Sequence, residues 1–436
     1  MRHASNDLEP FWLPFTANRD FKEQPRLVVE GKGIRLKSHT GHEILDAVSG
    51  LFCSPAGYGR PEIADAVHRQ LLDLSYIPSF QHSHPAAFEL ARRVAALTPG
   101  DLNHVFFVNS GSEAVETAMK MALQYHRARG QGQRQRFVGR ERGYHGVNFG
   151  GFSVGGIVRN REAFGLGLPG VLHMRHTWIP DVRFGQGQPA VGADLADDLQ
   201  RFCDLHGGES IAACIVEPVA GSTGCLPPPK GYLERLRSIC DRHGILLIFD
   251  EVICGFGRMG ENFGAQRFGV VPDMMTMAKA LTNGAIPMGA VAASARLHDT
   301  VMDAAPASAI EFFHGYTYSA HPTACAAGIA ALDIYERDGL FARAKALELH
   351  FLAALFALRD LPVVTDIRGI GLLGAIDLAP DGAPGKRGYR ALQELYDAGV
   401  LTKMTADSIL VAPAFIATEA EIDRMMAIIR SVIERY

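Results

Sequence analysis

The feature that most constrains this chain is a short apolar segment that ends in two acidic residues. Residues 245–249 are all apolar and include two isoleucines. An uninterrupted run of this length is typical of a strand buried in a parallel sheet. Asp250 and Glu251 follow directly, so two carboxylates are expected at the C-terminal edge of the strand. We expect the rest of the chain to be organised around this edge.

A single lysine follows the same strand after a glycine-rich loop. Lys279 comes directly after the mainly apolar residues 274–278. In such surroundings a lysine loses hydration, and its amine is more easily neutral and nucleophilic. A carboxylate one strand away, here Asp250, can keep the ring nitrogen of a pyridine cofactor protonated, so that the ring becomes an electron sink. The alternative is an ordinary surface lysine after a core strand.

Composition and charge exclude several classes of protein. The chain has 436 residues, 47% of them hydrophobic, and a net charge of −4, which gives no reason to expect a nucleic-acid or membrane partner. It has no apolar run of about 20 residues and no apolar segment near its N-terminus that would indicate a secretory signal. Its seven cysteines are scattered and never form a C-x-x-C pair, which favours a reducing compartment. We therefore expect a cytoplasmic protein.

Strand-like and helix-like segments alternate between residues 104 and 294. This alternation is typical of an α/β fold with a parallel, doubly wound sheet. Residues 245–252 and 289–294 are read as two of its strands. Beyond residue 322, two long helical segments precede shorter strands and two further helices, which predicts a smaller α+β domain. The expected organisation is an N-terminal arm belonging to the small domain (1–59), a large domain (60–320) and a C-terminal small domain (321–436).

A G-x-G-x-x-G pattern at residues 255–260 raises the alternative of a dinucleotide site. That motif needs a long helix opening directly on the pyrophosphate. The residues that follow, Glu261 to Gly264, form helices poorly. A link between the strand and Lys279 is the better interpretation.

Two other patterns are weaker still. Residues 151–155 match the G-x-S-x-G nucleophile elbow, but a glycine-containing segment precedes them instead of an apolar strand, so we predict a flexible loop. Histidines at positions 39, 42, 82 and 84 lack the spacing of a metal site. We expect no metal.

A second cluster of residues can hold a phosphorylated ring. Ser110, Gly111 and Ser112 follow an apolar strand and open an amphipathic helix, where free N–H groups and the helix dipole attract anions. The alternative for Ser110 is an ordinary N-cap. Tyr144 lies between glycines and can stack on a flat ring. Val252 comes two residues after Asp250, so on the same strand it points to the same face as Asp250 and can contact the other face of the ring. Together these residues fit pyridoxal 5'-phosphate (PLP) better than any other cofactor.

These stretches make the chain similar to the class III, fold type I, PLP-dependent aminotransferases. More narrowly, it resembles the ω-amino acid:pyruvate, or β-alanine:pyruvate, transaminases from about Trp12 to the C-terminus. The matching stretches are 14–19, 109–113, 143–146, 217–218, 250–252, Lys279 and 314–322. The resemblance implies a fold type I PLP-transferase, in which a large domain with a mostly parallel seven-stranded sheet carries a smaller C-terminal α+β domain.

The resemblance also implies a role for each matched residue. Lys279 would hold the cofactor covalently and move the proton, and Asp250 would pair with the ring nitrogen. The other cofactor-binding residues implied are Ser110, Gly111 and Ser112 at the phosphate, Tyr144 and Val252 on the two ring faces, His145 and Glu217 nearby, and Thr317, which would reach the phosphate from a neighbouring subunit. A homodimer or tetramer with sites at the subunit interface follows.

The implied reaction moves an amino group from an ω-amino acid or amine, such as β-alanine, to pyruvate by a ping-pong mechanism. Many class III enzymes that act on ornithine or γ-aminobutyrate have glutamine at the position of Ile253. The chain here resembles the pyruvate-using enzymes, which have isoleucine. Lys403 replaces the subfamily's carboxylate-binding arginine, which predicts altered carboxylate recognition. Phe52 and Phe15 stand in place of tryptophan and tyrosine. Phe52, Tyr144 and Lys403 are the expected substrate-binding residues.

Other functions stay open at this point. An amine-preferring transaminase, an aminomutase and a decarboxylase share the fold and the cofactor. A nicotinamide-dependent oxidoreductase would use residues 255–260 instead. A cofactor-binding but inactive interaction protein is disfavoured because Lys279 and Asp250 are both present.

Overall fold

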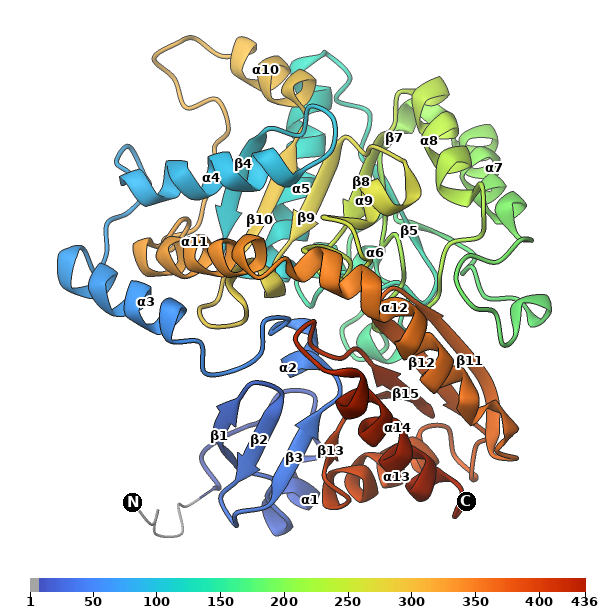
Figure 1. Cartoon of the computed structure of the whole chain (residues 1–436). Coiled ribbons are helices and arrows are strands. Elements are labelled where there is room, and N and C mark those ends of the chain that lie inside the picture. The colour runs from blue at the N-terminus through green and yellow to red at the C-terminus, as the bar shows by residue number, and fades with distance from the viewer. Residues whose placement is uncertain (1–7) are drawn as a thin grey trace.

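A seven-stranded sheet lies at the centre of the larger part of the molecule, which is described here by a computed structural model for residues 8–436 (Figure 1). Its strand order is β4-β10-β9-β8-β7-β5-β6. The strands are β4 (His104–Val108), β5 (Arg136–Arg140), β6 (Leu172–Met174), β7 (Ile211–Val216), β8 (Leu246–Asp250), β9 (Met274–Met277) and β10 (Gly289–Ala293). The pairs β5–β6, β5–β7, β7–β8 and β8–β9 are parallel. The predicted mostly parallel, seven-stranded sheet is confirmed.

The strand β10 departs from the parallel, doubly wound arrangement expected from the sequence. It pairs antiparallel with both of its neighbours, β4 and β9. Only 11 residues (278–288) join β9 to β10, fewer than the dozen or more that a parallel crossover needs. The short connection therefore makes the chain turn back beside β9.

Side-chain alternation along β8 divides the core into two layers. Leu247 and Phe249 are buried with residues of α4 (Pro85–Leu97) and α8 (Tyr232–His243), while Leu246 and Ile248 are buried with residues of α5 (Gly111–Ala128). Successive side chains of a strand point to opposite faces, so helices cover both faces of the sheet (Figure 1). The remaining helices of this part are α3 (Pro61–Asp73), α6 (Phe149–Val154), α7 (Asp197–His206), α9 (Gly264–Phe268) and α10 (Ala295–Asp303).

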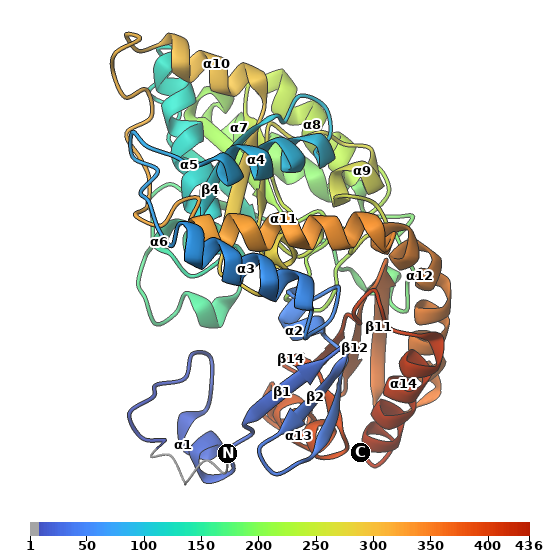
Figure 2. The same ribbon diagram turned by 60° about the vertical axis from the view of Figure 1, so that its left-hand side comes forward.

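The last third of the chain forms a smaller antiparallel sheet with the order β11-β12-β15-β14. Its strands are β11 (Val364–Ile370), β12 (Leu373–Leu378), β14 (Lys403–Thr405) and β15 (Ser408–Val411). Helix α11 (Pro322–Arg337) runs across the molecule and leads into α12 (Leu340–Phe356), which lies along this sheet with α13 (Lys386–Asp397) and α14 (Glu419–Ile433) (Figures 1 and 2).

The N-terminal segment joins this smaller part through a third sheet. Strands β1 (Val28–Lys32), β2 (Arg35–Ser38) and β3 (Glu43–Asp46) are antiparallel, and β13 (Val400–Leu401) pairs parallel with β3. The short helix α1 (Asn18–Glu23) buries none of its residues, but Asp20 accepts hydrogen bonds from Tyr389 and Gln393 of α13. No helix within residues 8–436 is long and apolar enough to span a bilayer.

The two glycine-rich motifs have structural roles. Residues 151–155 were predicted to be a flexible loop, but residues 150–154 are buried within α6. The hydroxyl of Ser153 donates to Phe149 O and accepts from Leu168 N at 2.8 Å, so it stabilises the local fold. Residues 255–260 form turns with no helix, as expected for a link between the strand of Asp250 and Lys279.

The segment α2 (Ser49–Phe52) is unusual because all four residues have positive φ. The values are 49° for Ser49, 57° for Gly50, 61° for Leu51 and 68° for Phe52. This is one turn of left-handed helix, which costs about 1–2 kcal/mol for each residue other than glycine. The surrounding structure must therefore hold it in place.

Candidate active site

A cavity of about 120 Å³ lies at the carboxyl ends of the parallel strands. Ligands bind at this edge in open α/β sheets. The residues that line it are Gly111, Ser112, Tyr144, His145, Gly146, Glu217, Asp250, Val252, Ile253, Ala278 and Lys279. Eight of these eleven had been predicted as site residues, although they come from five segments of the chain. The parallel strands bring the segments together because Glu217 follows β7, Asp250 ends β8 and Lys279 follows β9.

Asp250 is held by two hydrogen bonds in the wall of this cavity. Its Oδ2 lies 2.8 Å from His145 Nδ1, and its Oδ1 accepts from Val252 N at 3.1 Å. Both side chains of the His145–Asp250 pair are buried. The imidazole therefore donates from Nδ1, and its Nε2 is buried without a protein partner in residues 8–436.

The position of Val252 corrects one step of the sequence argument. Strand β8 ends at Asp250, so Val252 does not share a strand face with it. Instead, the Asp250 carboxylate accepts the Val252 N–H two residues on, a local turn that competes with the strand. This turn still places Val252 in the cavity wall.

Lys279 begins the short 3-10 helix η5 (Lys279–Thr282) with a positive φ of 48°. Burial lowers the pKa of its amine, and the negative charges of an ionised Cys53, Asp250 and Glu217 act in the opposite direction. Loss of hydration thus favours the neutral amine, which is the nucleophilic form.

Glu217 supports the loop that carries Tyr144. Its carboxylate accepts from Tyr144 N and from Gly221 N, both at 2.9 Å. Burial raises the pKa of Glu217, and a positive charge on His145 would oppose this shift. The carboxylate therefore fixes the Tyr144 backbone at the cavity wall.

The N-terminus of α5 has a side-chain cap and also leaves donors that suit an anion. Ser110 is the N-cap and accepts from Glu113 N at 3.2 Å, while Ser112 Oγ accepts from Val147 N at 3.2 Å. Each hydroxyl keeps its own hydrogen for donation to a ligand. The N–H groups of Gly111 and Ser112 have no acceptor within the helix. The two roles considered for Ser110, an ordinary N-cap and a phosphate ligand, are therefore compatible.

Besides Ser110, three predicted residues lie outside the cavity wall. Lys403 is half-buried, and its Nζ donates to Thr405 Oγ1 at 2.8 Å. Burial, followed by the positive charge of Lys279, lowers the pKa of Lys403 to about 8. Phe52 is only 3% exposed and belongs to the hydrophobic core. Thr317 is exposed, and its carbonyl accepts from the Tyr76 hydroxyl at 2.8 Å.

Sequence reasoning missed Cys53 and Gly146. An ionised Cys53 would raise the pKa of Lys279 more than Asp250 does, although burial raises the pKa of the Cys53 thiol itself; no spacing rule links residues so far apart in the chain. Gly146 lines the cavity with a φ of 93°. The signal that could have identified Gly146 as a site residue was its position directly after His145, with a second glycine at position 143.

The donor set fits PLP. The cavity places first-turn N–H groups and the Ser112 hydroxyl, which suit a phosphate, near a buried carboxylate that suits a ring nitrogen. It also presents a lysine whose lowered pKa suits reaction with an aldehyde. The absence of a side chain at Gly111 keeps the space beside Val252 open, because a Cβ at position 111 would lie 3.1 Å from the Val252 side chain.

Fold and site together define a PLP-dependent enzyme of fold type I. The chain belongs to the class III aminotransferase family, whose sequence profile matches residues 16–433. It is 54% identical over 432 residues to an ω-aminotransferase of Caulobacter vibrioides, covering 99% of this chain and 98% of the relative. It is 50% identical to a β-alanine–pyruvate aminotransferase of Pseudomonas aeruginosa, covering 96% and 94%.

Solved structures agree with this assignment. A thermostable (S)-enantioselective ω-transaminase from Thermomicrobium roseum superposes with a TM-score of 0.93 at 34% identity, covering 98% of this chain and 97% of that one. A PLP-bound amine transaminase from an uncultivated Pseudomonas species gives 0.91 at 36% identity and covers 98% of both chains.

Replacement of Gly146 by alanine tests how tightly the cavity wall is built. A Cβ at Gly146 would lie 2.4 Å from Ser112 Oγ, at a φ of 93°. We expect Gly146→Ala to lower the free energy of unfolding by more than about 2 kcal/mol and to weaken PLP binding.

The matched control is Gly130→Ala, which has a φ of 72° but no atom within 4 Å of the new Cβ. It should cost only about 1 kcal/mol. Urea unfolding and PLP titration of both variants give the comparison. Equal stability losses in the two variants would show that contact with Ser112 is unimportant.

Proposed function

We propose that this enzyme transfers an amino group from an ω-amino acid or related amine, such as β-alanine, to pyruvate by a ping-pong mechanism through pyridoxamine phosphate. The observation that carries the proposal is the buried amine of Lys279 in one cavity with Asp250. The names of the relatives from Caulobacter vibrioides and Pseudomonas aeruginosa support the choice of donor and acceptor.

Lys279 and Asp250 would carry the chemistry. When bound, PLP supplies an electron sink for the charge left by proton removal. Lys279 would hold the cofactor covalently and, once released, its neutral amine would remove the proton next to the donor nitrogen and return it later. Asp250 would keep the ring nitrogen protonated. The hydrogen bond from His145 would fix the orientation of that carboxylate.

The other cavity residues would bind and orient the cofactor. Ser110, Gly111 and Ser112 would donate hydrogen bonds to the phosphate from the N-terminus of α5. Tyr144 would stack on one face of the ring and Val252 would contact the other. Glu217 would hold the Tyr144 loop through its two backbone hydrogen bonds.

Asp250→Asn tests the electrostatic role of the carboxylate. Neutralising Asp250 should lower kcat with β-alanine and pyruvate by about 10²–10³-fold, the range for loss of a preorganised charge interaction. Lys279→Ala should abolish turnover. The measurement is alanine formation by purified protein saturated with PLP.

Glu251→Gln is the matched control for Asp250→Asn. This neighbouring buried carboxylate accepts from Gly264 N and Ala265 N, so it caps α9, and burial raises its pKa to about 7. Its loss should lower stability while kcat stays within about twofold, since no charge at the cofactor changes. Near-normal kcat in Asp250→Asn would contradict the scheme.

Lys403 would bind the carboxylate of the keto acid. Its side chain is half-buried, and the positive charge of Lys279 contributes to the lowering of its pKa, which supports a second cation near the reactive amine. A lysine offers a point charge, whereas an arginine offers a planar, bidentate fork. We therefore infer that pyruvate binding depends on whether Lys403 is protonated.

The pH dependence of KM for pyruvate tests this role. With a pKa of about 8 for Lys403, the charged fraction falls from about 90% at pH 7 to about 10% at pH 9, so KM should rise up to about ninefold. In Lys403→Arg the guanidinium stays charged, and this rise should vanish. Identical pH profiles for the two proteins would remove Lys403 from the carboxylate site.

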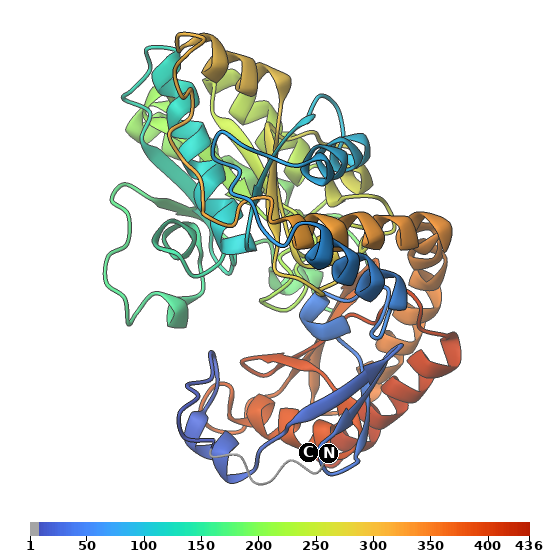
Figure 3. The same ribbon diagram turned by 90° about the vertical axis from the view of Figure 1, so that its left-hand side faces the viewer.

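A homodimer, or a tetramer of such dimers, is the proposed assembly. Several large apolar side chains are exposed in the single chain, including Trp12 (87%), Phe15 (79%), Leu166 (98%) and Phe313 (89%). The N-terminal arm and the loop that holds Leu166 project to the same side (Figure 3), as expected for an interface. Thr317, four residues after Phe313, would then reach the partner's phosphate.

Light scattering coupled to size exclusion tests the assembly. Wild type should elute at two or four times the chain mass of 47.2 kDa, and Phe313→Asp should shift it towards the monomer and weaken PLP binding, because an interface cannot bury an unpaired charge cheaply. Leu205→Asp is the control, at an exposed apolar residue of α7. A monomeric wild type would overturn the proposal.

We also place the enzyme in the cytoplasm. All seven cysteines are free thiols, and six of them are buried. Thiols that remain unpaired in this way support a reducing compartment.

A further inference from the structure

A stacked pair of histidines joins the edge strand β4 to helix α10. His104 is the first residue of β4, and His298 lies in the first turns of α10. Their ring centroids are 3.6 Å apart, and the ring planes differ by 9°. Nδ1 of His298 lies 2.9 Å from a carboxylate oxygen of Asp299. Two imidazoles and one carboxylate are therefore gathered at one edge of the large sheet.

The fold brings the two histidines together through the pairing of β4 with β10. These strands are antiparallel, and Ala293, the last residue of β10, lies opposite His104. Ser294 follows directly as the N-cap of α10, and its carbonyl accepts from His298 N at 3.0 Å. One helical turn thus brings His298 back beside the start of β4. Because both histidines belong to regular elements, their backbones hold them in place.

The cluster contains a buried nitrogen that lacks a partner. Nδ1 of His104 is buried and forms no hydrogen bond within residues 8–436. Most buried polar side-chain atoms in proteins have a partner, so this nitrogen indicates a ligand. His104, His298 and Asp299 each offer one ligand atom, and these atoms all lie within 4.8 Å of one another. In the described part of the chain no other group of three or more such side chains is gathered in this way.

The chemistry of these three groups selects a class of ion. Imidazole nitrogen suits Zn²⁺ and similar transition metals, whereas Ca²⁺ and Mg²⁺ prefer ligands that are all oxygen. Ligands of a tetrahedral zinc ion lie about 3.4 Å apart, since each bond is about 2.1 Å long. The cluster therefore needs to contract by about 1 Å. The side chain of His298 is 35% exposed and that of Asp299 is 64% exposed, so both can turn until their lone pairs point at the ion.

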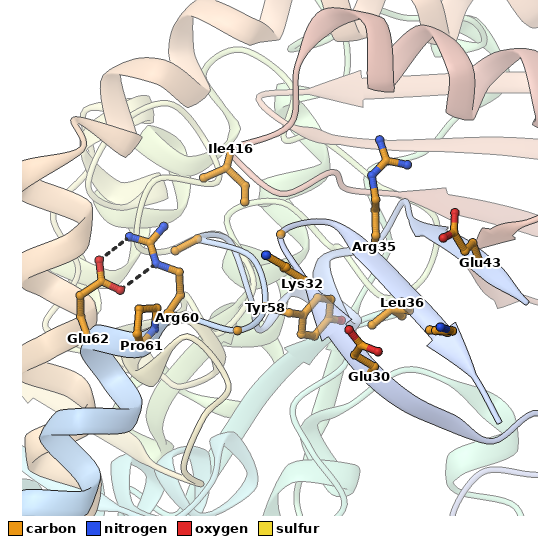
Figure 4. Close-up of a pocket in the computed structure, with 14 residues that line it drawn as sticks. Glu30, Lys32, Arg35, Leu36, Glu43, Tyr58, Arg60, Pro61, Glu62 and Ile416 are labelled. Atoms are coloured by element: carbon orange, nitrogen blue, oxygen red, sulfur yellow. Dashed lines mark hydrogen bonds and ion pairs between the residues drawn. The ribbon is translucent and has the colours of Figure 1, made fainter. Parts of the chain in front are cut away.

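The groove beside β1 and β2 offers no comparable set of ligands (Figure 4). Side chains of both charges line it. Arg60 forms ion pairs with Glu62 and Asp338, and Arg35 forms one with Glu421. These charges neutralise one another, so the groove does not favour an ion of either sign.

We propose that His104, His298 and Asp299 bind one divalent transition-metal ion, such as Zn²⁺, which fastens helix α10 to the start of β4. The ion would stabilise this part of the fold. It would not act in the active site, because β4 runs from His104 towards Ser110, so the histidines lie at the end of the strand away from the cavity. Helix α10 also lies far from the C-terminal part (Figure 2). The sequence predicted no metal, because the three ligands come from two distant segments.

Zinc titration of the holoenzyme tests the site. After dialysis against a chelator and then against buffer, wild type should bind one Zn²⁺ per chain by isothermal titration calorimetry. His298→Asn removes one imidazole at a partly exposed position, and the Kd should rise at least about tenfold, since even loss of an outer-shell partner costs 10- to 100-fold. His104→Asn should produce a similar loss.

His350→Asn is the matched control. Like His298, His350 lies on a helix and faces carboxylates, with Nε2 at 2.7 Å from Asp423 and Nδ1 at 3.9 Å from Glu419. No second histidine completes a set of three there. The Kd for Zn²⁺ should therefore stay at the value of wild type.

Hydrogen exchange locates the ion without any measurement of activity. One equivalent of Zn²⁺ should slow amide exchange in α10 of wild type and of His350→Asn, because an ion that binds only the folded form opposes local opening. The melting temperature should rise in the same two proteins. Neither effect should appear in His298→Asn.

Three results would overturn the proposal. The first is the absence of a saturable site, or binding only at millimolar Zn²⁺. The second is an unchanged Kd in both His104→Asn and His298→Asn. The third is an equal loss of affinity in His350→Asn, which would indicate general binding to surface histidines. None of these readouts depends on the proposed transaminase function.

Discussion

The structure depends on keeping an amine and a carboxylate buried in one cavity without letting them pair. Within residues 8–436 Lys279 forms no ion pair, and the two oxygens of Asp250 accept from His145 and from the Val252 N–H instead. A direct pair would stabilise the charged amine and remove its nucleophilicity. The His145–Asp250 hydrogen bond therefore orients the carboxylate, while burial favours the neutral, reactive form of the amine.

The parts of the site that could be predicted from the sequence are those whose position depends on residues close together in the chain. Asp250 and the N-terminus of α5 could be predicted because each directly follows an apolar strand, and parallel strands end at one edge. Val252 was assigned to the wrong element because its position depends on a hydrogen bond to a side chain. The antiparallel direction of β10 was not predicted, because it depends on the short connection of 11 residues from β9. Cys53 could not be predicted, since only the tertiary fold brings it to Lys279.

The glycine-rich segment 255–260 shows why a motif needs its context. Its glycines are required by packing, as at Gly257, where a Cβ would lie 2.4 Å from Phe341 at a φ of 96°. This close approach lets Arg258 extend into the interface between the large sheet and the C-terminal part, over the ring of Phe415 at 4.8 Å. The same residues that resemble a nucleotide loop thus join the two parts of the molecule beside the turn α2.

The two lysines would link substrate binding to the chemistry if Lys403 holds the keto acid. Lys279 and Lys403 have lowered pKa values, and the charge of Lys279 contributes to the shift at Lys403. A carboxylate bound at Lys403 would cancel part of the repulsion between the two ammonium groups, so the pKa of both amines would rise. The keto acid would therefore shift both amines towards their protonated forms. An arginine in place of Lys403 would stay charged whether or not the keto acid is bound. Only the pKa of Lys279 would then change when the carboxylate binds.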